Sequence, residues 1–133
     1  MSIRQAPMIP VSWGELIDKI TILELKRKKI RSRLARDKIE RELTLLLKLY
    51  EDVADNKGRI NDLKRDLESV NNDLWNAEDS LREKEARTIF DAEFIELARS
   101  VYKLNDKRFA IKQRLNAETA SEMIEEKIYP KYT

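Results

Sequence analysis

The chain has 133 residues, of which 39% are charged and 41% are hydrophobic, and its formal net charge is only +2. It contains 2 glycines, 3 prolines, no histidine and no cysteine, which excludes disulfides, thiol catalysis, histidine-based catalytic triads and the usual zinc sites. This composition is typical of long amphipathic helices, and we expect a single domain over residues 1–133, with an extended N-terminal tail at 1–10 and a C-terminal tail at 128–133.

The sequence also limits the cellular location and the kinds of partner that we expect. No stretch is apolar enough to span a membrane, and residues 1–10 lack the apolar core of a signal peptide. We therefore expect a cytoplasmic protein without a membrane partner. The net charge is small and positive and negative residues are interleaved over most of the chain, so we expect no nucleic-acid partner. We also expect no cofactor and no metal site, since the isolated Gly14 and Gly58 exclude a phosphate-binding glycine loop.

The first predicted helix begins with the capping box formed by Ser12 and Glu15. Apolar residues then recur at helical spacing from Leu16 to Leu34. Between Ile17 and Leu25 the helix is apolar nearly all round, which indicates a central position in the fold or contact with a second subunit. Residues 26–36 include seven Lys or Arg, which we interpret as the solvated end of this helix. Contact with an anionic surface or nucleic acid is the alternative.

The middle of the chain predicts two helices separated by a turn. Asp37 and Glu40 form a second capping box, which predicts the start of the second helix. The turn signal Asp55-Asn56-Lys57-Gly58 ends its apolar pattern. The third helix follows, with apolar positions Ile60, Leu63, Leu67, Val70, Leu74, Ala77 and Leu81. The alternative is one continuous helix from Asp37 to Arg87 with a kink at Gly58.

The end of the chain predicts a long helix and a short one. Asp91 is the expected N-cap of a fourth helix that runs to about Glu118, and a short helix follows at 121–127. The expected fold class is therefore all-α, an antiparallel up-down bundle of four long helices plus a short C-terminal helix. The alternative fold has three long helices, the second of which runs through Gly58.

Three polar residues, Asn105, Arg108 and Lys112, fall within the apolar face of the fourth helix. Because burying an unpaired cation is very costly, carboxylates or a bound anion must face Arg108 and Lys112. On the third helix, Glu78 and Glu85 follow one line, and antiparallel packing predicts that they supply these carboxylates. We interpret the layer first as an internal salt-bridge network. The alternative is a pocket for a phosphate or a carboxylate.

Three functions are compatible with this layer. The first is a binding or accessory module that recognises an anionic small molecule or partner. Its ligand-binding residues would be Arg82, Arg99, Tyr102, Asn105, Arg108 and Lys112. The second is a small enzyme in which Glu78 or Glu85 transfers a proton while Arg and Lys side chains clamp an anionic substrate. The third is a purely structural oligomeric bundle, and we expect a homodimer in all three cases.

Four segments between Pro10 and Tyr132 carry a resemblance: PVSWGELIDKITILELK, LWNAEDSLREKEA, FIELARSVYKLNDKRFAIKQRLN and EEKIYPKY. They resemble a family of small bacterial proteins of unknown function that opens with the signature P-V-S-x-G-E-L-I-D-K-x-T-I-L-E-x-K. The resemblance implies a helical fold, transfers no catalytic role, and suggests a link to surface-polysaccharide or nucleotide-sugar metabolism.

Overall fold

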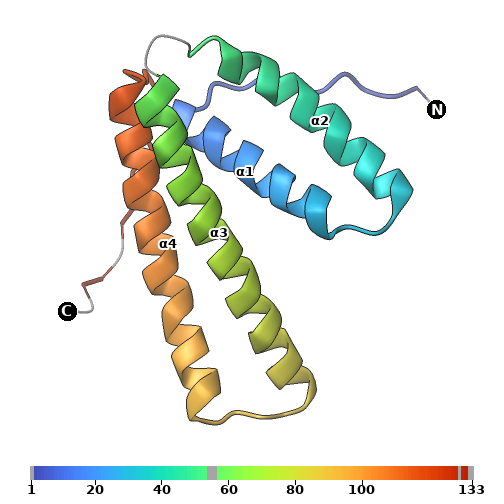
Figure 1. Cartoon of the computed structure of the whole chain (residues 1–133), viewed down its shortest axis with the longest axis vertical. Helices are drawn as coiled ribbons and strands as arrows, with labels where there is room; N and C mark the ends of the chain where they lie inside the picture. Colours follow the sequence, from blue (N-terminus) through green and yellow to red (C-terminus); the bar gives the residue numbers. More distant parts are fainter. Residues whose placement is uncertain (1, 54–56, 129, 132–133) are drawn as a thin grey trace.

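The computed structural model describes residues 2–53, 57–128 and 130–131, in which all regular structure is helical. The helices are α1 (Trp13–Lys29), α2 (Arg33–Glu51), α3 (Lys57–Ala86) and α4 (Ala92–Glu118). The predicted all-α class with four long helices is therefore confirmed. Helices α1 and α2 form one antiparallel hairpin, and α3 and α4 form a longer one (Figure 1). The shorter hairpin packs against one end of the longer hairpin, the end opposite the α3–α4 loop. The four helices therefore do not run side by side over their whole length.

Helix α1 is the centre of the fold and packs on two sides. Toward α3 and α4 it contributes Ile17, which is fully buried, and toward α2 it contributes Ile20, also fully buried. The larger core cluster comprises Ile17, Ile60, Leu63, Leu67, Val70, Leu74, Ile111 and Leu115. Full burial of such a side chain stabilises the fold by about 1.5–3 kcal/mol. Of the two positions expected for the first helix, the central one is confirmed, since α1 contributes to both core clusters. Ile22 and Leu25 on its remaining side are half-buried.

Two of the predicted helix starts are confirmed and one is wrong. The Ser12 hydroxyl accepts a hydrogen bond from the Glu15 amide at 3.0 Å, and the Asp91 carboxylate accepts one from the Phe94 amide at 2.9 Å. The second helix begins at Arg33 rather than at Asp37, because Ser32 already caps it and accepts a bond from the Ala35 amide. The Ser32 side chain satisfies one of the free amides of the first turn, so the helix can begin there, and Asp37 lies inside the helix with no capping role.

The first helix is correspondingly shorter than expected. It ends at Lys29, because Ile30 adopts an extended backbone with φ −76° and ψ 139°. Leu34 therefore belongs to the first turn of α2, where 69% of it is exposed, and does not extend the apolar stripe of α1.

The break between the second and third helices is confirmed, and the alternative of one continuous helix is wrong. Helix α2 ends at Glu51 and Val53 is not helical, while α3 begins at Lys57. The first half of the predicted turn signal, Asp55 and Asn56, lies outside the described residues.

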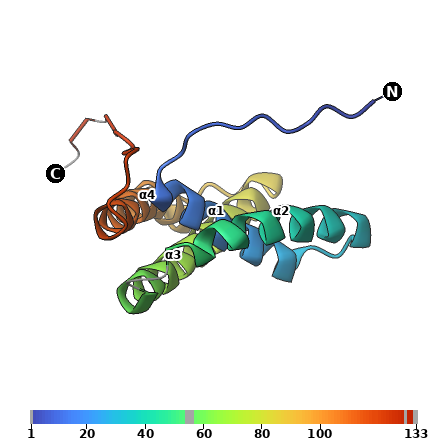
Figure 2. The same ribbon diagram turned by 90° about the horizontal axis from the view of Figure 1, so that it is seen from above.

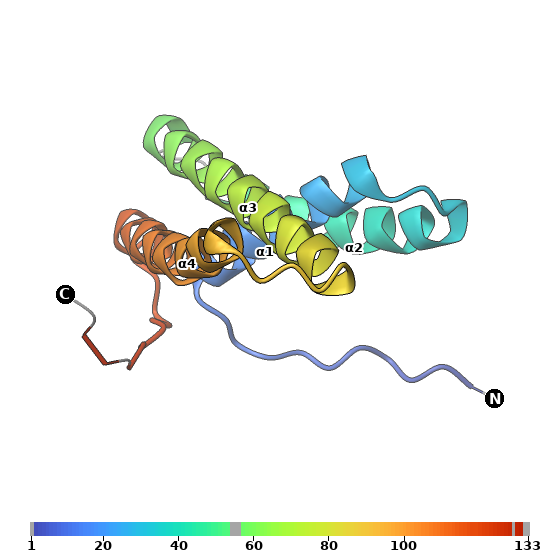
Figure 3. The same ribbon diagram turned by 90° about the horizontal axis from the view of Figure 1, so that it is seen from below.

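The short helix expected at 121–127 is wrong, since residues 121–128 are not helical. Helix α4 ends in a tight turn at Ala120, whose φ is 50°, and the Ser121 amide donates to the Asn116 carbonyl at 2.8 Å. The turn redirects the chain, and Lys127 then binds Asp106 of α4 at 3.1 Å. These side-chain contacts with α4 replace a further helical turn. The C-terminal segment and the extended N-terminal segment lie on the same side of the helices (Figures 2 and 3).

No helix in the described part of the chain combines the length and apolar character needed to cross a membrane.

Candidate functional site

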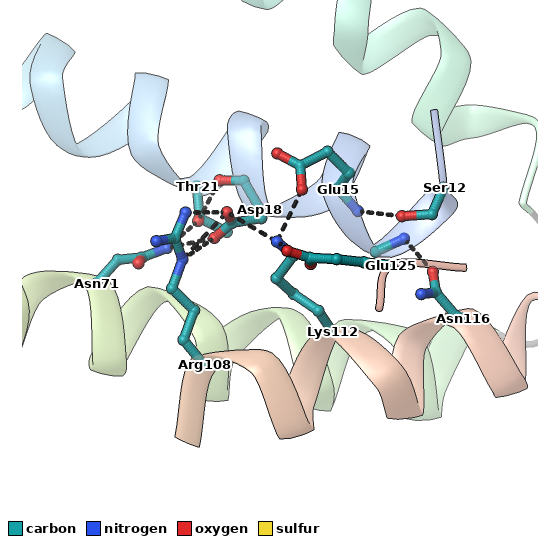
Figure 4. Close-up of polar contacts among 10 residues, drawn as sticks. Ser12, Glu15, Asp18, Thr21, Asn71, Arg108, Lys112, Asn116 and Glu125 are labelled. Atoms are coloured by element: carbon teal, nitrogen blue, oxygen red, sulfur yellow. Dashed lines mark hydrogen bonds and ion pairs between the residues drawn. The ribbon is translucent and has the colours of Figure 1, made fainter. Parts of the chain in front are cut away.

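Arg108 projects from α4 toward α1, and its partner there is Asp18 (Figure 4). Arg108 Nε lies 3.1 Å from each oxygen of the Asp18 carboxylate, and Nη2 also binds Oδ2. Asn71 of α3 donates to Asp18 Oδ1 at 2.9 Å and to Thr21 Oγ1 at 2.8 Å. Only 1% of Asp18 is exposed, so the carboxylate is buried among these donors. One acid on α1 thus joins α1 to both α3 and α4.

Lys112 projects from α4 one turn further on and is surrounded by acids. Its Nζ lies 2.7 Å from Glu15 Oε2, 2.8 Å from Glu125 Oε2 and 4.0 Å from Asp18 Oδ2. Burial lowers the pKa of Lys112, but the hydrogen bonds that Lys112 donates to Glu125 and Glu15 outweigh this effect and raise that pKa above the ordinary value. The hydrogen bond to Asp18 likewise raises the pKa of Arg108. Both cations are therefore held in their charged forms.

We call Glu15, Asp18, Asn71, Arg108, Lys112 and Glu125 the polar layer. In this layer two cations face three carboxylates, so the protein itself supplies more negative than positive charge. An additional phosphate or carboxylate would meet repulsion rather than an unpaired cation. The structure accordingly shows the internal salt-bridge network that the sequence predicted, although the acidic partners come from other elements than expected.

Glu78 and Glu85 were expected to face Arg108 and Lys112, and this prediction is wrong. Both glutamates are exposed on α3, and within the described residues neither forms an ion pair with these cations. Asn71 is the α3 residue that shares a partner with Arg108. A helix rises 1.5 Å per residue, so Glu78 lies roughly 10 Å and Glu85 roughly 21 Å beyond Asn71 along α3. Helix α1 occupies the place that the prediction gave to these acids.

The remaining predicted ligand-binding residues do not gather around the polar layer. Arg82 is exposed on α3, and Arg99 binds Glu96 at 3.1 Å on the surface of α4. A hydrogen bond with Tyr102 and the nearby Glu96 raise the pKa of Arg99. Asn105 is half-buried one turn before Arg108 on α4. Of these six residues, Arg108 and Lys112 make the ion pairs of the layer in the described part of the chain, and Arg82 and Arg99 are exposed on the surfaces of α3 and α4.

Gly14 permits the close approach of α1 and α4 on which the polar layer depends. Its amide donates to Asn116 Oδ1 at 2.7 Å. A Cβ at this position would lie 2.6 Å from the Lys112 carbonyl oxygen and 2.8 Å from Asn116 Oδ1. Any residue other than glycine would force the two helices apart next to Lys112.

A groove of about 760 Å³ opens at the other end of α1, where the α1–α2 loop approaches α3. Its apolar lining consists of Leu23, Ile30, Ala35, Ile39 and Trp75, and its basic lining of Lys26, Lys29, Arg31 and Lys38. All four cations are exposed. Among the described residues none of the four forms an ion pair with a carboxylate, and Glu42, the acid of the lining, pairs with Lys19 at 3.2 Å. We call this the basic groove.

Three cations of the basic run at 26–36, namely Lys26, Lys29 and Arg31, line this groove, and the run is not the end of one helix as the sequence suggested. It spans the last turn of α1, the loop and the first turn of α2. Cations are favourable at the C-terminal end of α1, but the first turn of α2 carries Arg33 and Arg36 and no acid. The N-terminal end of a helix is positive and favours acids, so these arginines add to the positive potential at some cost to stability. The hairpin end therefore attracts anions more strongly than the net charge of the chain indicates.

The fold and these two features define a small all-helical protein with a buried charge layer and an open basic groove. The chain belongs to a family described only as a family of unknown function, DUF6165, which matches residues 8–132. No curated protein and no solved structure matches the chain. The family description names neither a ligand nor a reaction.

Proposed function

We propose that this protein is a helical binding module that recognises an anionic ligand in the basic groove. The observation that carries the proposal is the set of four exposed cations, Lys26, Lys29, Arg31 and Lys38, which lack carboxylate partners among the described residues. The groove volume of about 760 Å³ suits a small-molecule ligand, since such sites typically measure roughly 300–1,000 Å³. Hydrogen bonds from these groups to a phosphate or carboxylate are charge-assisted and stronger than neutral ones.

The proposal moves the ligand site away from the polar layer that the sequence singled out. Arg108 and Lys112 already bind three carboxylates of the same chain, and the cations of the basic groove do not bind any among the described residues. The layer has a supporting role in this proposal. It fixes α1 against α3 and α4, and α1 carries Lys26 roughly 12 Å beyond Asp18.

The lining of the groove also restricts the chemistry of the ligand. Leu23, Ile39 and Trp75 give it an apolar surface beside the cations. Lys29 lies over the Trp75 ring, with Nζ 5.6 Å from the ring centroid. A ligand that combines an anionic group with an apolar or planar part would use both kinds of surface. Nucleotides and nucleotide sugars have this chemistry, and the resemblance noted in the sequence gives the nucleotide sugars a place among the test compounds.

An acid/base enzyme has less support in the geometry. Glu78 and Glu85 are exposed on α3, apart from Arg108 and Lys112, so the electrostatic clamp envisaged for such an enzyme is not assembled around them. A proton-transfer group acts most effectively in a site where positioned charges stabilise the transition state.

Isothermal titration calorimetry tests the binding proposal. The wild-type chain is titrated with inorganic phosphate, pyrophosphate, nucleoside diphosphates and nucleotide sugars. The variant Lys26→Gln/Lys29→Gln/Lys38→Gln removes three exposed cations of the groove. The control Lys48→Gln/Lys103→Gln/Lys107→Gln removes three exposed cations elsewhere, so both variants have the same net charge.

We expect at least one compound to bind the wild type and the control with similar affinity and the groove variant at least tenfold more weakly. Equal weakening in the two variants would show that the binding reflects overall charge and would contradict the proposal. Absence of binding by every compound at millimolar concentration would contradict it as well.

A further inference from the structure

The free end of the α1–α2 hairpin combines positive charge with exposed apolar surface. Residues 26–36 include seven Lys or Arg and no acid. Leu34 lies among them and is 69% exposed, and Ile30 lines the basic groove beside Arg31. The α1–α2 loop lies to one side of the α3–α4 hairpin (Figure 1). Trp75 of α3 borders the groove, but Leu34 and the four groove cations are exposed.

We propose that this end docks on a membrane surface that contains anionic lipids. The lipid phosphates bind the cations around the basic groove, and Leu34 enters the boundary between headgroups and acyl chains. The inference rests on the proposed anion-binding function and names the source of the anion. It departs from our expectation of no membrane partner, which considered only segments that could span a bilayer.

The two kinds of residue at this end match the two requirements of interfacial binding. Stable attachment of a surface protein needs apolar insertion together with electrostatic attraction. Each Lys or Arg close to an anionic leaflet strengthens binding about fivefold. Three of them therefore contribute roughly a hundredfold. The geometry is fixed beforehand, since Arg36 Nη2 donates to the Ile30 carbonyl at 3.2 Å across the loop and Ser32 caps α2.

The same observations favour a lipid surface over a single-stranded nucleic acid. Binding of single strands relies on exposed aromatic rings on which bases stack. Trp75 is the one aromatic residue among the described residues that line the groove, so the groove offers a surface for one planar group but no series of rings for successive bases. Leu34, in contrast, offers an aliphatic side chain that bases use little and acyl chains use well.

Vesicle flotation with the full chain tests this inference. Vesicles of phosphatidylcholine alone are compared with vesicles that also contain phosphatidylglycerol. We expect the wild type to float only with the anionic vesicles and to dissociate as the salt concentration rises. The groove variant Lys26→Gln/Lys29→Gln/Lys38→Gln should bind roughly a hundredfold more weakly, and the control Lys48→Gln/Lys103→Gln/Lys107→Gln should keep most of the wild-type affinity.

Leu34→Gln separates insertion from simple charge attraction. The side chain is largely exposed, so the substitution leaves the fold intact. We expect a several-fold loss of vesicle binding with unchanged binding of inorganic phosphate. In a Trp13→Phe background, Trp75 is the only tryptophan, and its emission should shift to shorter wavelength on binding anionic vesicles.

Each other outcome overturns the inference in a recognisable way. Binding of soluble phosphates without flotation would leave the proposed function standing and remove the membrane. Equal flotation of the wild type and the groove variant would place any lipid contact elsewhere. Binding of RNA or DNA more tightly than anionic vesicles would identify nucleic acid as the partner. Failure of every anion, soluble or lipid, would overturn the inference and the proposed function together.

Discussion

Replacing the buried acid of the polar layer with its amide, Asp18→Asn, tests whether the layer holds the two hairpins together. The carboxylate is 1% exposed and binds Arg108 through both oxygens, with Asn71 as a further donor. The amide has nearly the same size, but it loses the charge and turns a donor toward groups that are themselves donors. Removing one member of a buried ion pair costs about 3–5 kcal/mol, since the partner charge stays behind unpaired.

The expected value lies at the lower end of this range, because Arg108 is not fully buried. Its side chain keeps 27% exposure, so it regains some hydration when Asp18 is neutral. We expect a loss of about 3 kcal/mol in the free energy of unfolding. For a chain of 133 residues this lowers Tm by roughly 10 °C.

Urea unfolding followed by circular dichroism measures this loss, with Asp73→Asn as the matched control on the exposed surface of α3. The control should change the stability by less than about 0.5 kcal/mol. The double variant Asp18→Asn/Arg108→Met should lose less than the sum of its single variants, because both remove the same interaction. A loss below about 1 kcal/mol for Asp18→Asn would show that the acid–arginine contact contributes little and would refute the reasoning.

Three further predictions concern stability. Gly14→Ala should lower the free energy of unfolding by about 1–3 kcal/mol because its Cβ would lie 2.6 Å from the Lys112 carbonyl oxygen, while Gly58→Ala, with no atom within 4 Å, should raise it by about 0.5–1 kcal/mol. Chemical denaturation measures both changes, and changes of the same sign would contradict the close packing of α1 against α4 at Gly14. Thr88→Gly should raise Tm through a gain of about 1 kcal/mol, since Thr88 has a φ of 56°, a left-handed conformation that costs a β-branched residue most; an unchanged or lower Tm would count against that strain. Burial lowers the pKa of Lys112, but the hydrogen bonds to Glu125 and Glu15 raise it above 10.5, so the stability that charged Lys112 contributes is complete below pH 10.5 and is lost as the pH rises through the higher folded-state pKa. Tm should therefore fall more steeply above pH 10.5 in the wild type than in Lys112→Met, and parallel curves of Tm against pH would contradict this role of Lys112.

Much of the fold could be predicted from local patterns in the sequence. The caps Ser12 and Asp91 and the apolar spacing of α3 depend on neighbouring residues alone, and the structure confirms them. The failures arose where two local solutions competed or where tertiary contacts decided. Ser32 and Asp37 are both good caps, and periodicity does not rank them. The end at 121–127 is held by a turn at Ala120 and by side-chain contacts that no local pattern encodes.

The candidate site was harder to predict because a periodic pattern tells which face of a helix is buried but not which element covers it. Arg108 and Lys112 were correctly expected to need acidic partners. The choice of α3 followed from its position next to α4 along the chain, whereas the acids come from α1 and from the C-terminal segment. The sequence did contain a signal for the correct acidic partner, since Asp18 is a charged residue within the apolar surface of α1, just as Arg108 is within the apolar face of α4. Matching a buried acid to a buried base would have paired these helices.

The polar layer and the basic groove are connected through α1, which contributes to both core clusters and to both sites. The layer fixes α1 at its N-terminal half, and the groove cations Lys26 and Lys29 lie at its C-terminal end. A buried ion pair adds little net stability compared with apolar packing, but it tolerates little displacement of its two members. The layer is therefore suited to fixing the angle at which the α1–α2 hairpin crosses α3 and α4. In this account Asp18 is a positioning residue for the groove, and its substitution should weaken anion binding without removing any cation that contacts the ligand.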